Sequence, residues 1–399
     1  MKNALVIGAT EDSVFSMELA RKYGYAIYAI DGDKQAKGLK YADYSYVEDI
    51  NDLDKVFAIT DEIKPNIVLP APIGHCLTTV GAVNDRYELT GVSKSSADIC
   101  TDKYIFDELL SKSGLRNGQT ALLKKESKIN ILDFDRFDTF PLIVKPRFGS
   151  GSREVEVLMS RDELNEWINQ KGYLEEDIVI EKCVDGEEYG IDGAFVEGHF
   201  ILTLLRKKKN TEFPYRQCVG YISVPEKEDS EFWNKCKDLM QKTGDILGFK
   251  TCVIHADIIK DCHENPFIIE TSARPSGHSL SNYFTPRVTG VVLVDEFIKY
   301  VRQEKYSFEA PQTEKMMIRY FDLGEGIVKK VPKKEDILKI PGVVDYVCNI
   351  KTGDCLNKVI NGASIMGRGF YLLKASDEKE LYKLDESIRK EFSIMKKEK

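Results

Sequence analysis

The chain has 399 residues, of which 42% are hydrophobic and 31% charged, and its formal net charge is −8. This length excludes a single small module and allows two or three domains with substantial cores. The acidic balance argues against nucleic acid as a partner, because nucleic-acid-binding proteins carry a concentrated basic surface that displaces counterions.

The cysteines and the apolar runs indicate where in the cell the protein is expected. Nine cysteines are scattered without a CxxC pair, so the sequence indicates neither a disulfide framework nor a tetrahedral zinc site. The first residues, M-K-N-A-L-V-I-G, are typical of a β-strand rather than a signal peptide, and no apolar run reaches the ~18 residues of a membrane span. We therefore expect a cytoplasmic protein without a membrane partner.

The first 70 residues alternate strands and helices. This rhythm predicts a parallel, doubly wound sheet. Its first turn begins at Gly8 but lacks the later glycines of G-x-G-x-x-G, so an NAD-dependent dehydrogenase is weakly supported. Asp31, after the second strand, could bind a ribose, although an acid at a strand end is commonly a loop residue. The expected strands are 4–7, 26–30 and 67–69, and the expected helices 14–23 and 53–63.

Two lysines stand out in the next segment. Lys103 lies in the first turn of a predicted helix at 102–110, where its charge opposes the helix dipole, although a solvated lysine is the common case. Lys145 ends the aliphatic strand 141–146. An ammonium group inside such a strand must find an anion.

A Gly/Ser loop, R-F-G-S-G-S-R, follows at 147–153. Its backbone N–H groups, hydroxyls and arginines could cradle phosphate, although such a loop is often only a flexible turn. It lacks the G-x-x-x-x-G-K-[ST] spacing of a P-loop. Ser160 and Glu163 form a capping box that predicts a helix to about residue 170.

Antiparallel structure is predicted beyond this helix. A strand at 177–184 contains the polar pair Glu181–Lys182, and Glu188 follows it. A hairpin joins 193–196 to 200–204 through Glu197–Gly198. The basic run 206–209 is either a solvated loop or a patch that meets phosphate or carboxylate, and Arg216 is expected in the same loop.

The hairpin at 253–271 is the most informative stretch. With a turn at 262–265 and Asp261 paired with Pro266, Asp257 faces Glu270 and His255 faces Ser272. Like charges directly opposite each other destabilise a sheet, so a positive partner is expected, and a hard divalent cation suits oxygen ligands. A solvated hairpin is the alternative, but the flanking residues are too apolar for one. His255 is more simply a hydrogen-bonded core histidine.

The last 90 residues are predicted to mix strands and helices. They contain a predicted strand at 316–321 and helices at 334–340 and 376–392. The change from parallel to antiparallel patterns near residue 93 and this mixed region predict three domains. These are 1–93, 94–309 with a lid subdomain at about 115–185, and 310–399.

In this order, the features resemble the ATP-grasp superfamily over about residues 1–392: a helix lysine, a strand-end lysine with a Gly/Ser loop, an E-K-x-V strand with a later Glu, and an Asp/Glu hairpin. The resemblance implies an α/β and α+β multidomain ATP-grasp fold with a Rossmann-like N-terminal domain and a small C-terminal α+β domain. The C-terminal part, with M-G-R-G-F-Y-L-L, is similar to carboxylate-amine ligases, including L-amino-acid ligases, and to biotin carboxylase. That places it nearer these than to the D-alanine ligase branch.

The resemblance also implies a site that binds ATP and Mg²⁺, or Mn²⁺ in its place. Arg274 and Lys145 are the implied catalytic groups, with Arg274 holding the transferring phosphoryl group. Ser272 stands where many members have Asn, which weakens the second metal position. The implied nucleotide residues are Lys103, Lys145, Ser150, Gly151, Ser152, Glu181, Lys182, Val184 and Glu188, and the implied metal ligands are Asp257, Glu270 and Ser272.

The implied activity is ATP-dependent ligation, in which a small-molecule carboxylate is activated as an acylphosphate and coupled to an amine. A bicarbonate-activating carboxylase or carbamoyl-phosphate-type enzyme, a phosphoribosylamine ligase and an ATP-binding sensor remain alternatives, and a homodimer is an open possibility. The candidate substrate residues are Arg206, Arg216, His278 and the loop 73–76.

Overall fold

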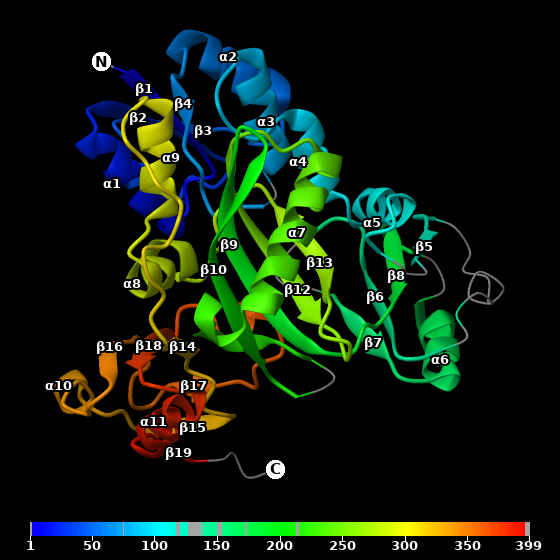
Figure 1. Ribbon diagram of the computed structural model, residues 1–399, viewed down its shortest axis with the longest axis vertical. Coiled ribbons are helices and arrows are strands. Elements are labelled where there is room, and N and C mark those ends of the chain that lie inside the picture. The colour runs from blue at the N-terminus through cyan, green and yellow to red at the C-terminus, as the bar shows by residue number, and fades with distance from the viewer. Residues whose placement is uncertain are drawn as a thin grey trace.

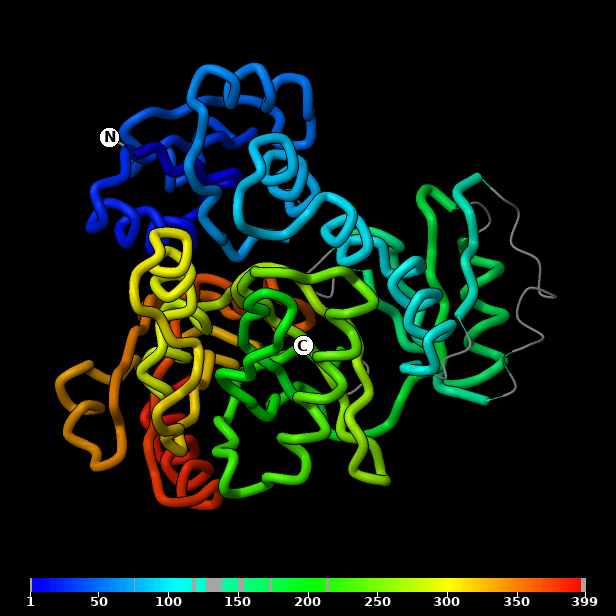
Figure 2. The backbone as a smooth tube through the Cα atoms, turned by 45° about the horizontal axis from the view of Figure 1, so that its top comes forward, coloured from blue at the N-terminus to red at the C-terminus, as the bar shows by residue number. Residues whose placement is uncertain are grey.

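The computed structural model describes residues 2–74, 76–116, 120–126, 137, 139–149, 154–171, 174–212 and 215–395. The predicted Ser150, Gly151 and Ser152 lie outside these ranges. Figure 1 shows the N-terminal region at one end of a long central sheet, a small sheet to one side, and the C-terminal region at the other end. Figure 2 shows the same arrangement from a second direction.

The N-terminal region is the predicted βαβ unit. Its four-stranded sheet has the order β3-β2-β1-β4, and all of its pairings are parallel. Asp31 is the last residue of β2, and its carboxylate accepts the N–H groups of Ala9 at 2.6 Å and Asp33 at 2.8 Å. The elements are β1 Lys2–Ile7, α1 Val14–Lys22, β2 Tyr25–Asp31, β3 Tyr44–Val47, α2 Leu53–Ile63, β4 Ile67–Val68 and α3 Leu77–Arg86.

A small antiparallel sheet follows two connecting helices, α4 Lys94–Thr101 and α5 Lys103–Lys112. Its strand order is β5-β8-β6-β7, and we call it the lid sheet. The capping interaction at Ser160 is present, because its hydroxyl accepts the Glu163 N–H at 3.2 Å. The elements are β5 Thr120–Leu123, β6 Leu142–Pro146, β7 Glu156–Leu158, α6 Arg161–Lys171 and β8 Ile178–Lys182.

The central sheet has eight strands in the order β13-β12-β9-β10-β11-β14-β18-β16. Helix α7 covers one face, and α9 with the N-terminal region covers the other (Figure 1). The predicted hairpin with Glu197 and Gly198 in its turn is confirmed and is longer than expected. The elements before residue 310 are β9 Glu187–Val196, β10 His199–Asn210, β11 Cys218–Ser223, α7 Ser230–Leu247, β12 Cys252–Lys260, β13 Pro266–Ser272, α8 Thr285–Thr289 and α9 Leu293–Val301.

The last 90 residues belong partly to this sheet. Strands β14, β18 and β16 extend it through the pairing of β14 with β11, while β17, β15 and β19 form a separate sheet. The division of the chain at residues 93 and 309 stays a prediction. The elements are β14 Met316–Tyr320, β15 Gly326–Lys330, α10 Lys334–Ile337, β16 Val343–Cys348, β17 Cys355–Leu356, β18 Gly369–Lys374, α11 Glu378–Lys390 and β19 Ser393–Met395.

None of the helices in the described ranges combines the length and apolar character needed to cross a bilayer.

Helix α7 approaches the central sheet closely at Gly244. A Cβ atom added there would lie 2.1 Å from the ring of Phe195, which is fully buried in β9. Alanine in a helix is ordinarily favoured over glycine by about 1 kcal/mol. At Gly244 we expect alanine to be unfavourable instead, because its Cβ would force the Phe195 ring or helix α7 to move.

We therefore expect Gly244→Ala to lower the free energy of unfolding by about 1–3 kcal/mol, as overpacked core substitutions do. Urea unfolding measures the loss. Gly32→Ala is the matched control, since its added Cβ would lie 3.7 Å from the nearest atom, an ordinary contact. A Gly244→Ala variant as stable as the Gly32→Ala variant would contradict the close approach.

Candidate functional site

The Asp/Glu hairpin has the predicted register at its functional end. Asp257 on β12 pairs with Glu270 on β13, and His255 pairs with Ser272. The predicted pairing next to the turn is wrong by one residue, because Lys260 rather than Asp261 faces Pro266. Asp261 belongs to the turn, where its carboxylate accepts the Asn265 N–H at 2.8 Å. A register shift after Asp257 restores the opposition of the two acids.

A lysine supplies the positive charge that the two acids require. Lys208 Nζ lies 2.6 Å from Asp257 Oδ2 and 3.9 Å from Glu188 Oε2, and its side chain is 8% exposed. Burial opposes its charged form, but the carboxylates outweigh burial and raise the pKa of Lys208. Sequence reasoning missed Lys208 as a site residue, and its place within the basic run was the available signal.

The basic run is part of β10 and not a loop. Successive side chains of a strand point to opposite faces, so Arg206 and Lys208 share the face of the site. Lys207 and Lys209 point the other way, where Lys207 Nζ lies 2.5 Å from Glu187 Oε1 and Lys209 Nζ 4.0 Å from Asp385 Oδ2. The run therefore meets carboxylates on both faces.

Arg206, a candidate substrate residue, is buried against an acid of the protein. Its side chain is 1% exposed and forms an ion pair with Asp192, which is fully buried. The guanidinium lies 5.1 Å from the centre of the Tyr221 ring, and an added Cβ at Gly190 would lie 2.9 Å from Arg206 Nε. Asp192 already supplies an anion for Arg206, which argues against Arg206 as a substrate residue.

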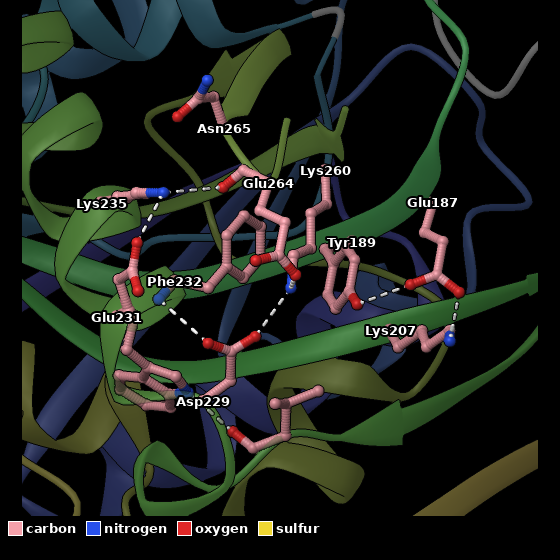
Figure 3. Close-up of polar contacts among 12 residues, drawn as sticks. Glu187, Tyr189, Lys207, Asp229, Glu231, Phe232, Lys235, Lys260, Glu264 and Asn265 are labelled. Carbon is pink, nitrogen blue, oxygen red and sulfur yellow. Dashed lines mark hydrogen bonds and ion pairs between the residues drawn. The ribbon is translucent and has the colours of Figure 1, made fainter. Parts of the chain in front are cut away.

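The turn end of the hairpin is clamped to α7 by a charged network (Figure 3). Lys260 Nζ lies 2.8 Å from Asp229 Oδ2 and 3.1 Å from Glu264 Oε1. Lys235 on α7 donates to the Glu264 carbonyl at 3.3 Å. The strand that carries Asp257 is thus fixed against the helix that covers the sheet.

The donor set on the hairpin fits a hard cation. Asp257, Glu270 and Ser272 present only oxygen atoms, and Glu270 is exposed with no ion pair among the described residues. No group of three or more His, Cys, Asp or Glu side chains in the described ranges could hold a metal alone. Mg²⁺ ordinarily takes one or two carboxylates and completes its shell with water and phosphate oxygens. The site therefore suits a metal that arrives with a phosphorylated ligand.

The anion that Lys145 requires is Glu181. Lys145 Nζ lies 2.5 Å from Glu181 Oε1, and both side chains are at most 10% exposed. Lys103 Nζ donates to the Gly149 carbonyl at 3.0 Å, which ties α5 to the start of the Gly/Ser loop. Burial lowers the pKa of Lys103, and Glu270 offsets part of that effect. The charge of Lys145 also lowers the pKa of Lys103, so the two lysines lie near each other.

The predicted adenine hinge begins at the end of β8. Glu181 pairs with Thr120 on β5 and Ile143 on β6, and Lys182 pairs with Leu142 on β6. The Cys183 N–H donates to the Pro141 carbonyl at 3.0 Å. The Glu181 side chain is committed to Lys145, and the roles of Lys182 and Val184 at the adenine stay a prediction.

Glu188, the predicted ribose acid, is bound by an arginine. Arg216 Nη2 lies 2.7 Å and Nε 3.0 Å from Glu188 Oε1. Arg216 thus stands beside the nucleotide residues, in the segment between β10 and β11. The Arg216 guanidinium and a ribose would compete for the same carboxylate.

Arg274 lies where the hairpin meets the N-terminal region. Its Nε is buried without a hydrogen-bond partner in the described part of the chain, and an added Cβ at Gly74 would lie 3.3 Å from it. Burial lowers the pKa of Arg274. The predicted loop 73–76 therefore reaches the arginine, although His75 lies outside the described residues.

The two histidines differ in their surroundings. Burial, with Arg274 nearby, lowers the pKa of His255 to about 3, so this imidazole is neutral at physiological pH. Its Nδ1 lies 3.4 Å from the Arg274 carbonyl oxygen, as expected for a core histidine. His278 is exposed with a left-handed φ of 55°, and its carbonyl accepts the Tyr320 hydroxyl at 2.6 Å. His278 as a substrate residue stays a prediction.

The chain was compared with known proteins. A family model described as ATP-grasp domain matches residues 138–282. The D-alanine–D-alanine ligase of Bacillus anthracis is 32% identical over 113 residues, which are 27% of this chain and 37% of that ligase. The carbamoyl phosphate synthase large chain of Thermoanaerobacter sp. is 29% identical over 166 residues, 40% of this chain and 15% of the synthase. The chain thus spans well under half the length of these relatives.

Solved structures are similar over the whole chain. The L-amino acid ligase from Bacillus licheniformis has a TM-score of 0.79 and 18% identity, covering 100% of this chain and 99% of that one. The N5-carboxyaminoimidazole ribonucleotide synthetase from Thermotoga maritima has a TM-score of 0.73 and 15% identity, covering 100% of both chains. The predicted ATP-grasp fold, with α/β and α+β parts, is confirmed.

The buried pair of Arg206 and Asp192 yields a stability prediction. Asp192→Asn leaves the guanidinium without its acid, and breaking a buried pair in this way costs about 3–5 kcal/mol. Replacing both residues, as Asp192→Leu with Arg206→Met, should restore most of that loss because no charge remains buried. Urea unfolding of the two variants measures the difference. A loss under about 1 kcal/mol in Asp192→Asn would contradict a structural role for Arg206.

Proposed function

We propose that this chain, which contains an ATP-grasp domain, is an ATP-dependent ligase that joins a small-molecule carboxylate to an amine and releases ADP and phosphate. A carboxylate oxygen attacks the γ-phosphorus in line, and the bond to the ADP oxygen breaks. The amine nitrogen then attacks the acyl carbon of the acylphosphate, phosphate leaves, and the amine loses a proton. No side-chain nucleophile is required.

One observation carries this proposal: Asp257 and Glu270 oppose each other in register beside Lys208. This concentration of charge at an open strand edge suits phosphoryl transfer, which depends mainly on positioning and charge neutralisation. Mg²⁺, when bound by Asp257 and Glu270, would supply further neutralisation of phosphate charge. Ser272 offers only a weak additional oxygen.

The same proposal assigns roles to the other site residues. Lys145 and Lys103 are proposed to hold phosphate oxygens, and the backbone at Lys182 and Val184 to hold the adenine edge. Arg274, with its unpartnered buried Nε, is proposed to hold the transferring phosphoryl group. Glu188 is proposed to accept the ribose hydroxyls, for which it would give up part of its contact with Arg216. The segment with Ser150, Gly151 and Ser152 completes the proposed phosphate site.

The direct test is ADP formation by purified protein with ATP, Mg²⁺ and mixed amino acids, with products identified by mass. The Asp257→Asn/Glu270→Gln double variant is the control, and we expect the unaltered protein to be at least ~100-fold faster, the size of a lost electrostatic group. Equal rates would refute the proposal. ADP release that depends on bicarbonate and needs no amine would favour a carboxylase instead.

Lys208 provides a second test with a control on the same strand. Lys208→Met removes the cation beside Asp257 and should lower the rate of ADP formation roughly 100-fold or more. It should also strengthen Mn²⁺ binding to the free protein, because the metal no longer competes with the ammonium for Asp257. Lys209→Met, on the opposite face, should change neither quantity. Equal effects of the two substitutions would argue against a role for Lys208 in the site.

A further inference from the structure

Arg116 occupies a buried junction that the proposed roles leave unexplained. It follows α5, and its side chain is 4% exposed. Nη1 lies 2.9 Å from Asp107 Oδ1 on α5, and Nη2 lies 3.6 Å from Glu181 Oε2 on β8. The guanidinium also stacks over Phe267 on β13, 4.8 Å from the ring centre. One side chain thus joins the helix, the lid sheet and the strand that carries Glu270.

Two cations, Arg116 and Lys145, face two acids at this junction. Glu181 divides its two oxygens between two cations, with Oε1 toward Lys145 and Oε2 toward Arg116. Asp107 is the second acid and contacts Arg116. Burial favours the protonated form of Glu181, but Lys145 and Arg116 together outweigh burial and hold its pKa below the ordinary value.

We propose that Arg116 is a positioning residue for the nucleotide: it compensates the charge of Glu181, so that the Lys145 ammonium can turn to a phosphate oxygen without leaving a buried carboxylate unpaired. The inference rests on the proposed function, because it takes Lys145 to be a nucleotide ligand. Arg116 itself touches no substrate and acts through Glu181.

The physical reason is the cost of an orphaned buried charge. Without Arg116, Lys145 is the only cation among the described residues that forms an ion pair with Glu181, and an uncompensated ion in a buried site is strongly unfavourable. The ammonium would then stay on Glu181 and be less available to the nucleotide. A planar guanidinium suits the role because its separate nitrogens reach Asp107 and Glu181 at once, which a lysine cannot do.

Binding of MgADP, measured by calorimetry at several pH values, tests the inference without turnover. Arg116→Gln should bind MgADP roughly tenfold more weakly at pH 8, the effect of one charge-assisted contact. The ratio of its dissociation constant to that of the unaltered protein should fall toward pH 6. Acid protonates the less well compensated Glu181 in the variant and frees Lys145. Protonation of the nucleotide affects both dissociation constants equally, so it does not change their ratio.

A suppressor variant separates this role from simple packing. Adding Glu181→Gln to Arg116→Gln removes the acid that retains Lys145, so the double variant should bind MgADP more tightly than Arg116→Gln alone. Loss of packing would instead make the double variant weaker. Arg116→Lys keeps the charge and should recover part of the affinity. Arg86→Gln, which removes an exposed ion pair with Asp61, is the remote control.

Arg116→Gln leaves Asp107 buried without its cation and could unfold. In that event, the Asp107→Asn/Arg116→Gln variant removes both charges and is measured in the same way. A pH-independent ratio near one, or a further loss on adding Glu181→Gln, would overturn the role of Arg116 while the proposed function stands. Failure of the unaltered protein to bind MgADP would overturn both.

Discussion

The opposition of two carboxylates across β12 and β13 is the constraint on which the site depends. Asp257 and Glu270 face each other on adjacent strands, and like charges in that geometry require a positive partner. In this structure Lys208 supplies it from the next strand but one, at 2.6 Å from Asp257. Glu270 is exposed on the edge strand and forms no ion pair within the part of the chain that the structure describes. Asp257 binds Lys208 in this structure, and the oxygens of Asp257 and Glu270 together suit a divalent metal ion.

Strand β10 links this constraint to the rest of the molecule. Its alternating side chains place Lys208 in the site, while Lys207 reaches Glu187 and Glu378, and Lys209 reaches Asp385. Glu378 and Asp385 lie on α11, the last long helix of the chain. The C-terminal region thus contacts the strand that carries Lys208 through α11, and it continues the same sheet through the pairing of β14 with β11.

Much of this arrangement could be predicted from local sequence patterns. The residues whose roles could not be predicted share one property: their partners are distant in the sequence. The strands and helices of the first 70 residues and the pairing of Asp257 with Glu270 could be predicted, because apolar periodicity and short turns are local signals. The role of Arg206 could not, since its partner Asp192 is identified only once β9 and β10 pair. Arg116 carries no local signal either, because Asp107, Glu181 and Phe267 come from three separate elements.

The two lysine clusters share one design. Lys145 is held by Glu181, which Arg116 also contacts, and Lys208 lies between Asp257 and Glu188, which Arg216 also contacts. In each case the protein has already removed water from an ammonium group and fixed it against an acid before any ligand arrives. Preorganised charges of this kind need little rearrangement when a phosphate replaces the acid as their partner. The arginines of the two clusters differ in their place: Arg116 contacts Glu181, the acid that holds Lys145, whereas Arg216 contacts Glu188 and not Asp257, the acid nearest to Lys208.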